Sequence, residues 1–564
     1  MKNDNWKTCT VFLLTVFLTA CVDSPSTTTI TYDAEQTRPN ILLIVVDDMG
    51  YSDLGSFGGE IPTPNLDQLA NSGVRFSNFI ASSVCSPTRA SLLTGVTPHK
   101  AGHGNLAEEL APNQLGQPGY EGELNQRVVT IATLLRDAGY HTYITGKWHL
   151  GKSRESIPWS RGFERSFTLL ANASHFADMR PAYSPDPDAL ALYQKDQHRL
   201  TRLPDNFSYS SQFFVDELQH YIDSTDDDAP FFGMLAFTAP HWPIQAPDSS
   251  IAEFLGKYDV GYDAIAAERL DRLKTEGLIP VNSGLAPRPP KGVPWNSLDS
   301  EQQMVEARAM EIYAAMITEI DRNTGRLIEW LRAEDRFKNT VVIFMSDNGA
   351  EGHDLDETWP SDAFPKIRQV IDESFDFSYE SMGRPGSYTF LGPNWAHALA
   401  PAFNLHKGFA SEGGLRTAAF MYSENKFDSA TISNRLITPE DLAATILDLA
   451  AVQHPGNNYR GKVVEPITGI SILAGLPGLE PDQHRVHINE TMGKISVRKG
   501  DWKLTRMPAP YGNGDWQLFN LRQDLSETHD LAETHPHKVT GLIAEWEKYV
   551  ETNGVILPDW LSGY

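Results

Sequence analysis

The sequence predicts an α/β protein whose central sheet is mostly parallel and sandwiched by helices, followed by a small C-terminal α+β region. Four strands, three of them apolar runs, alternate with helical patterns, which is typical of parallel strands buried on both faces. From about residue 485 the pattern changes to short strands separated by Gly-containing turns. The predicted strands are residues 40–46, 140–145, 230–237 and 338–345 in the large sheet, and 494–498, 501–504 and 516–519 in the small one.

Apolar residues at helical spacing predict the helices that cover these sheets. We expect a large domain over residues 38–455 and a C-terminal subdomain, an antiparallel sheet with one helix, over residues 456–564. Two long polar stretches, 151–228 and 351–400, are expected to be loop-rich segments that shape ligand binding. The predicted helices are residues 128–138, 211–222, 301–332, 436–451 and 538–551.

The N-terminus is predicted to be an export and anchoring segment. Lys2 and Lys7 precede an apolar run at 11–18 that is too short for a permanent transmembrane helix. The run closes on Leu18-Thr19-Ala20-Cys21, which resembles a bacterial lipoprotein box with Cys21 as the acylated residue; a plain secretory peptide is the alternative. We expect a signal peptide over 1–20, a flexible tether over 21–37, and an exported lipoprotein anchored in a bacterial cell envelope, in the periplasm or at the cell surface.

Charge and cysteine content narrow the function. The formal net charge of −26 argues against nucleic acid as a partner, and it requires any site for an anionic substrate to be locally cationic. The chain has three cysteines. Cys9 falls in the signal and Cys21 takes the lipid, so Cys85 has no partner for an intramolecular disulfide. This points to a chemical role for Cys85.

Polar residues follow each predicted strand of the large sheet at its carboxyl end. In open α/β sheets ligands bind at that edge, and hard oxygen donors favour Ca²⁺ or Mg²⁺. The chain also brings cationic groups there. The strand-end residues are Asp47 and Asp48, then Lys147 and His149, then His241, and finally Asp347 and Asn348.

Cys85 is predicted to stand at the start of a helix. Ser86 is a good N-cap, Pro87 suits the first helical position, and Gly95 ends the helix. The positive end of the helix dipole then lies beside Cys85, and Arg89 can reach back from one turn on. A small buried cysteine before an ordinary helix is the alternative interpretation.

Several motifs resemble those of the sulfatase family. Cys85-Ser86-Pro87-Thr88-Arg89, within Ser83–Gly95, resembles the first sulfatase signature, and Gly146-Lys147-Trp148-His149 resembles the second, although Thr145 departs from the small or aliphatic residue expected there. The likeness is greatest to bacterial arylsulfatases, and it implies an alkaline-phosphatase-like fold. The segments that carry it are 119–122, 161–165 and 392–396.

The resemblance also implies a site. Cys85 would be oxidised to formylglycine by a maturation enzyme, and its hydrated aldehyde would be the nucleophile. One Ca²⁺ would be held by Asp47, Asp48, Asp347, Asn348 and an oxygen of modified residue 85. Arg89, Lys147, His241 and Lys407, the last shortly before Glu412-Gly413-Gly414, would supply positive charge around it. Asp347 is implied as base for attack, His241 with Lys407 as proton donors to the leaving alcohol, and His149 as base for sulfate release.

The implied activity is hydrolysis of sulfate esters, arylsulfatase-type and directed at a sulfated small molecule or saccharide. A formylglycine-dependent phosphonate or phosphate ester hydrolase on the same fold is the nearest alternative, because such a site suits any tetrahedral anion. An inactive, lipid-anchored glycan-binding protein is a second alternative, and the presence of every implied catalytic residue argues against it.

Overall fold

The computed structural model describes residues 38–560 except 226, 428–429 and 476–481. The predicted signal peptide and tether, with Cys21, lie outside the described residues. All described residues belong to one compact unit, and the predicted division near residue 455 stays a prediction. Within these residues, no helix combines the length and the apolar character needed to cross a membrane.

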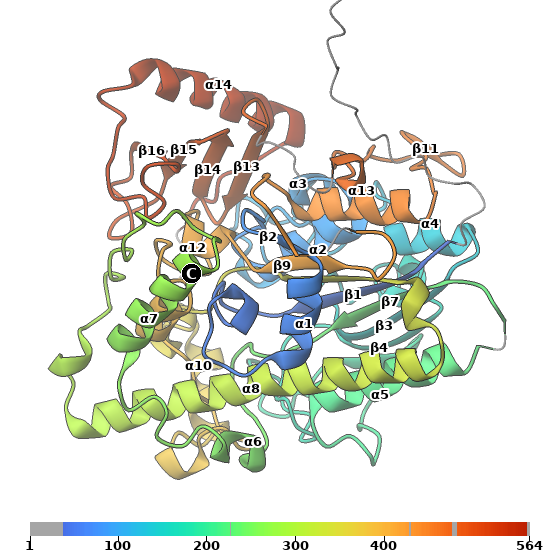
Figure 1. The fold of residues 1–564 in the computed structure, drawn as a ribbon, viewed down its shortest axis with the longest axis horizontal. Coiled ribbons are helices and arrows are strands. Elements are labelled where there is room, and N and C mark those ends of the chain that lie inside the picture. The colour runs from blue at the N-terminus through green and yellow to red at the C-terminus, as the bar shows by residue number, and fades with distance from the viewer. Residues whose placement is uncertain (1–37, 226, 428–429, 476–481, 561–564) are drawn as a thin grey trace, which may run out of the picture. The chain divides into compact units, whose positions relative to one another are not determined.

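A ten-stranded mixed sheet forms the centre of the molecule (Figure 1). Its middle strands β8, β1, β7, β3 and β4 are mutually parallel, and β9 and β5 join them antiparallel on either side. The order is β10-β2-β9-β8-β1-β7-β3-β4-β5-β6. The bounds are β1 Asn40–Val46, β2 Val74–Phe76, β3 His141–Lys147, β4 Arg165–Leu169, β5 Tyr193–Lys195, β6 His198–Arg199, β7 Phe231–Ala236, β8 Thr340–Ser346, β9 Ala419–Tyr422 and β10 Thr431–Ser433.

Helices cover both faces of this sheet because β1 is apolar on both. Alternate residues of a strand point to opposite faces. Leu42 and Ile44 belong to the apolar cluster formed with α1, α5, α7, α8 and α11, whereas Ile41 and Leu43 pack with α2, α4 and α13 (Figure 1). The helices are α1 Pro64–Ser72, α2 Cys85–Thr94, α3 Pro98–Ala101, α4 Ile131–Asp137, α5 Ser210–Asp223, α6 Asp248–Ala252, α7 Tyr262–Thr275, α8 Ser300–Ala333, α9 Leu355–Thr358, α10 Pro365–Ser374, α11 Pro393–Leu399, α12 Glu412–Leu415, α13 Pro439–Leu449 and α14 Pro536–Asn553.

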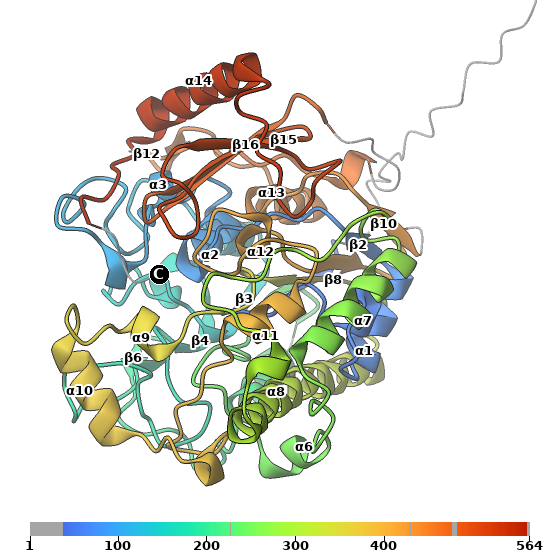
Figure 2. The ribbon, with the colours of Figure 1, turned by 90° about the vertical axis from the view of Figure 1, so that its left-hand side faces the viewer.

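The C-terminal region is a separate antiparallel sheet with α14 packed on it (Figure 2). Leu504 and Leu518 of the sheet bury their side chains against Leu542 and Trp546 of α14. The predicted sheet and helix are confirmed, and β13 is an additional strand. The strands are β13 Val486–Thr491, β14 Lys494–Lys499, β15 Trp502–Arg506 and β16 Trp516–Asn520; a short pair, β11 Asn458–Tyr459 and β12 Lys462–Val463, precedes them.

Helix boundaries differ from the sequence-based expectation at one important place. Helix α2 begins at Cys85 and its N-cap is Val84, which has extended backbone angles, φ −144° and ψ 161°. Ser86 is therefore not the N-cap as predicted, and Pro87 lies at the third helical position. Proline is still tolerated there, because the first turn has no intrahelical acceptor for its N–H. Short 3₁₀ helices complete the fold: Gly55–Phe57, Ala107–Glu109, Pro158–Arg161, Trp295–Ser297, Phe337–Asn339, Tyr379–Ser381 and Leu473–Gly475.

Candidate active site

The predicted polar residues meet at one edge of the sheet. Strands β8, β1, β7 and β3 are neighbours and parallel, so their carboxyl ends deliver side chains to the same place. Lys147 is the last residue of β3, and Asp47, Asp48, His149, His241, Asp347 and Asn348 follow their strands within five positions. Cys85 and Arg89 come from helix α2, and Lys407 comes from the loop before α12. All of them are buried: Asp47, Asp48, Cys85, Arg89, Lys147, His149, His241, Asp347, Asn348 and Lys407.

Arg89 links helix α2 to two strand ends. Its Nε donates to Asp347 Oδ2 over 2.7 Å, and its Nη1 donates to the backbone carbonyl of Lys147 over 3.0 Å. Its Nη2 lies 3.7 Å from Asp47 Oδ1. Burial raises the pKa of Asp347, but the charges of Arg89, Lys147 and Lys407 and the hydrogen bond from Arg89 oppose it, and the pKa lies below the usual value. Asp347 is therefore held ionised.

Cys85 faces a lysine and a histidine from the exit of β3. The distance from Cys85 Sγ is 3.6 Å to Lys147 Nζ and 3.4 Å to His149 Nδ1. Lys147 and His149 therefore point toward the same sulfur atom. Burial raises the pKa of the Cys85 thiol, although Lys147 and Lys407 lower it. An unmodified Cys85 is thus held as a neutral thiol, which is a weak nucleophile.

Lys407 and His241 both approach the same carboxylate oxygen of Asp48. Lys407 Nζ donates to Asp48 Oδ2 over 2.8 Å, and His241 Nε2 lies 3.6 Å from the same oxygen. The Nδ1–H of His241 donates to the carbonyl of Trp242, which fixes the tautomer. Burial, with Lys407 and Lys147 nearby, lowers the pKa of His241 well below its ordinary value. The ring is therefore neutral in the substrate-free site.

The oxygen atoms around Asp47 and Asp48 fit a calcium ion. Burial, together with nearby carboxylates, raises the pKa of Asp47 well above its usual value and raises that of Asp48, although lysines oppose both shifts. Asn348 Nδ2 donates to Asp48 Oδ1 over 2.7 Å, while its buried Oδ1 finds no hydrogen-bond partner among the described residues. A divalent cation would be coordinated by the Oδ1 of Asn348, and its charge would favour the ionised forms of Asp47 and Asp48. Candidate ligand atoms of Asp47, Cys85 and Asp347 lie within 4.8 Å of one another.

Two site residues were missed by sequence analysis. Glu108 lies in the 3₁₀ helix Ala107–Glu109, with Oε2 3.5 Å from His149 Nε2. Glu351 follows β8 by five residues, and its Oε2 lies 3.0 Å from Lys407 Nζ. Nothing in the sequence around Glu108 marks it, because its partner is 41 residues away. Glu351 could have been suspected from its place after Asp347 and Asn348 on the same strand exit.

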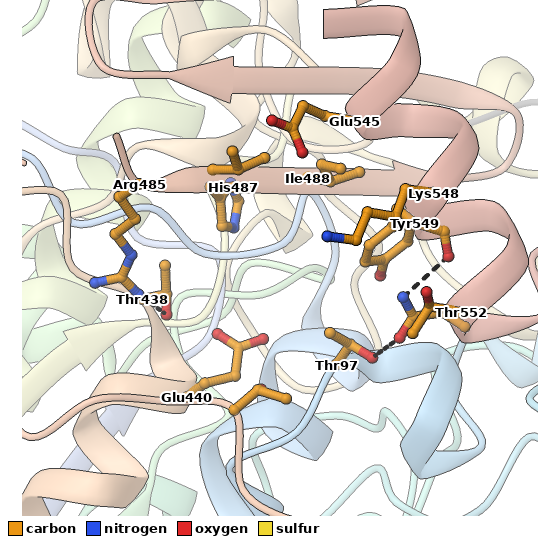
Figure 3. Close-up of a pocket in the computed structure, with 13 residues that line it drawn as sticks. Thr97, Thr438, Glu440, Arg485, His487, Ile488, Glu545, Lys548, Tyr549 and Thr552 are labelled. Carbon is orange, nitrogen blue, oxygen red and sulfur yellow. Dashed lines mark hydrogen bonds between the residues drawn. The ribbon is translucent and has the colours of Figure 1, made fainter. Parts of the chain in front are cut away.

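A cavity lies away from the candidate active site and is lined by other residues. It has a volume of about 290 Å³ and lies between α13, β13 and α14. Glu440 and Lys548 face it from opposite sides (Figure 3). None of the predicted site residues lines this cavity, so it is distinct from the site at the sheet edge.

Comparisons with known proteins agree with this geometry. The Sulfatase family profile matches residues 39–452. An arylsulfatase of Klebsiella aerogenes is 38% identical over 469 residues, which cover 82% of this chain and 96% of that protein. The chain belongs to the sulfatase family. An uncharacterized sulfatase of Schizosaccharomyces pombe is also 38% identical, over 545 residues covering 93% of this sulfatase and 96% of the relative.

A solved structure of low sequence identity shares the fold. The crystal structure of Ps i-CgsB in complex with k-i-k-neocarrahexaose superimposes with a TM-score of 0.64 at 23% identity, covering 93% of this chain and 95% of the other. The predicted family and its alkaline-phosphatase-like fold are confirmed. This sulfatase is arylsulfatase-like, and its reaction is the hydrolysis of sulfate esters.

Proposed function

We propose that this sulfatase removes sulfate from a carbohydrate ester, using formylglycine at residue 85 and one Ca²⁺. The observation that carries the proposal is the position of Cys85, at the first residue of α2 and within 3.6 Å of both Lys147 Nζ and His149 Nδ1. A maturation enzyme acting on the signature around Cys85 would supply the aldehyde. The long segments 151–228 and 351–400 would bind the saccharide and determine which one is accepted.

The proposed ion is held by Asp47, Asp48, Asp347 and Asn348 with an oxygen of residue 85. When bound, Ca²⁺ polarises the sulfate group and offsets the negative charge of reactant and carboxylates. Arg89, Lys147 and Lys407 make the site cationic within a protein of net charge −26, as an anionic substrate requires.

Four residues move protons in the proposed reaction. The hydrated aldehyde offers two hydroxyl groups, one to attack sulfur and one to release sulfate as the C=O bond re-forms. Asp347 takes the proton of the attacking hydroxyl, and the Lys407 ammonium protonates the leaving alcohol. His241 shares this role from Nε2 once the bound sulfate ester, an anion, favours the protonated ring. His149, whose Nδ1 faces residue 85, takes the proton of the second hydroxyl. Burial, followed by the charge of Lys147, lowers the pKa of His149, which keeps its ring able to accept that proton.

Two measurements test this proposal. Mass spectrometry of the peptide containing Cys85, from enzyme made with a maturation enzyme present, should show the aldehyde; an unmodified thiol in fully active enzyme would contradict it. Side-by-side rates on 4-nitrophenyl sulfate and phenyl phosphonate, followed by a panel of defined sulfated saccharides, should favour sulfate esters and identify a saccharide. A higher kcat/KM on the phosphonate would instead support the alternative hydrolase.

We also propose export and lipid anchoring through Cys21. The support is the run of residues 11–18 and the Leu-Thr-Ala-Cys sequence that ends it. Radiolabelled palmitate should be incorporated into the wild-type protein, and the Cys21→Ser variant should remain unlabelled. Labelling of both proteins would place the acyl group elsewhere.

A further inference from the structure

Glu351 contacts both Lys407 and Trp242 through one carboxylate oxygen. Its Oε2 lies 3.0 Å from Lys407 Nζ and accepts a hydrogen bond of 3.2 Å from Trp242 Nε1. Lys407 Nζ is also 2.8 Å from Asp48 Oδ2, so its ammonium group lies between two carboxylates. Two fixed anionic partners hold a flexible lysine side chain in a defined place.

The other oxygen of Glu351 is held by His353. Glu351 Oε1 accepts hydrogen bonds from the backbone N–H of His353, at 2.9 Å, and from its Nδ1, at 2.7 Å. Burial opposes ionisation of Glu351, but Lys407 and His353 together hold its pKa well below the usual range. Glu351 is therefore a buried anion, 5% exposed, with hydrogen-bond donors fixed at both oxygens.

Trp242 extends this network to His241. The carbonyl of Trp242 accepts the Nδ1–H of His241 at 2.6 Å, and the two rings lie 4.7 Å apart between centroids. One carboxylate oxygen thus supports both groups that are proposed to protonate the leaving alcohol. It contacts Lys407 directly, and it reaches His241 through the indole and carbonyl of Trp242.

From this network we infer that Glu351, held by His353, is a positioning residue for leaving-group protonation by Lys407 and His241. The inference rests on the proposed roles of those two residues. Glu351 contacts Lys407, Trp242 and His353, so it can act through these residues without touching the substrate.

Leaving-group dependence tests this role directly. A proton donor matters most when the departing oxygen is basic and least when it is a stable anion. Glu351→Gln offers one accepting oxygen where the site has donors at two, so either the Lys407 side or the His353 side loses its acceptor. We expect kcat/KM to fall about threefold on 4-nitrophenyl sulfate and about a hundredfold on phenyl sulfate, which has the poorer leaving group. Across a series of aryl sulfates the dependence on leaving-group pKa should become steeper.

Glu357→Gln is the matched control. Glu357 lies in the same segment and is tied to a different cation, Lys291 at 2.9 Å, and to the hydroxyl of Tyr511 at 2.7 Å. Its leaving-group dependence should equal that of the wild type. Glu351→Asp keeps the negative charge, so its rate on phenyl sulfate should lie between those of Glu351→Gln and the wild type. If Glu351→Gln folds poorly, Glu351→Asp replaces it as the test variant.

A double-variant cycle completes the test. If Glu351 acts through Lys407, adding Glu351→Gln to Lys407→Ala should change the leaving-group dependence much less than it does in the wild type. Equal losses on every aryl sulfate, or full additivity with Lys407→Ala, would overturn the inference. A wild-type enzyme that releases sulfate neither from aryl sulfates nor from any of the sulfated saccharides would instead refute the proposed function.

Discussion

Arg89 and Asp347 form a buried ion pair between the first helix of the site and the end of β8. The guanidinium Nε and Nη2 both lie 2.7 Å from Asp347 Oδ2, and both side chains are fully buried. The pair sets the position of Asp347 relative to Cys85, because Arg89 and Cys85 share helix α2. It thereby connects the helix of the proposed nucleophile to the proposed metal ligands.

Removing one partner of this pair should destabilise the protein. We expect Arg89→Met to lower the free energy of unfolding by about 3–5 kcal/mol, because Asp347 would remain as a buried charge without its main partner. Urea denaturation followed by circular dichroism measures the change, and Arg322→Met, at a half-exposed surface ion pair with Glu253, is the control, with an expected loss below about 1 kcal/mol. Similar losses for both variants would show that the buried Arg89–Asp347 pair contributes no more to the free energy of unfolding than a surface ion pair.

Replacing Cys85 should separate chemistry from folding. We expect Cys85→Ala to abolish turnover of 4-nitrophenyl sulfate while lowering stability by only about 1 kcal/mol, since the side chain that is lost is small. Turnover is followed by the release of 4-nitrophenol, and folding by thermal unfolding. A variant that retained wild-type-like turnover would remove residue 85 from the nucleophile role.

Removal of divalent metal should lower both activity and stability. Without a cation, Asp47 and Asp48 are disfavoured as ions by burial and by neighbouring carboxylates. We expect chelated, dialysed enzyme to lose activity and to melt at a lower temperature, and Ca²⁺ to restore both; a ligand at 100 times its Kd stabilises by about 2.7 kcal/mol. Full activity in a preparation shown by elemental analysis to be metal-free would exclude the ion from the mechanism.

Glu306 on α8 should make stability depend on pH. Burial raises its pKa from 4.5 to about 7, and its Oε2 finds no hydrogen-bond partner among the described residues. The folded state thus binds a proton that the unfolded state has released, so this contribution is complete below about pH 4.5 and is lost as pH rises through about 7.

Glu306→Gln tests that sign. The variant and the wild type should be about equally stable near pH 4.5, and at pH 8 the variant should be more stable by about 1–3 kcal/mol. Urea denaturation at both pH values measures the difference. An advantage that is the same at both pH values would mean that Glu306 does not titrate between them.

The central strands could be predicted because a strand buried on both faces has a continuous run of apolar residues. β1 was predicted with its observed bounds, since residues 41–46 are apolar on both faces. The three-residue strands β2 and β10 could not be, because strands this short acquire their identity from the neighbours with which they pair. The helix α2 was predicted, but its cap at Val84 was not, because Ser86 satisfies the local N-cap preference far better than a valine, which has no side-chain acceptor.

The sequence alone determined which chemical groups this sulfatase carries and that strand ends deliver them: carboxylates after β1 and β8, a lysine and a histidine at β3, and Cys85 at the start of a helix. Parallel neighbours share a carboxyl edge, so local patterns were sufficient for that conclusion. Only the tertiary structure decided that Glu351 lies against Lys407 and Trp242, and Glu108 against His149. These contacts join segments separated along the chain, and their distances depend on loop paths that no local propensity specifies.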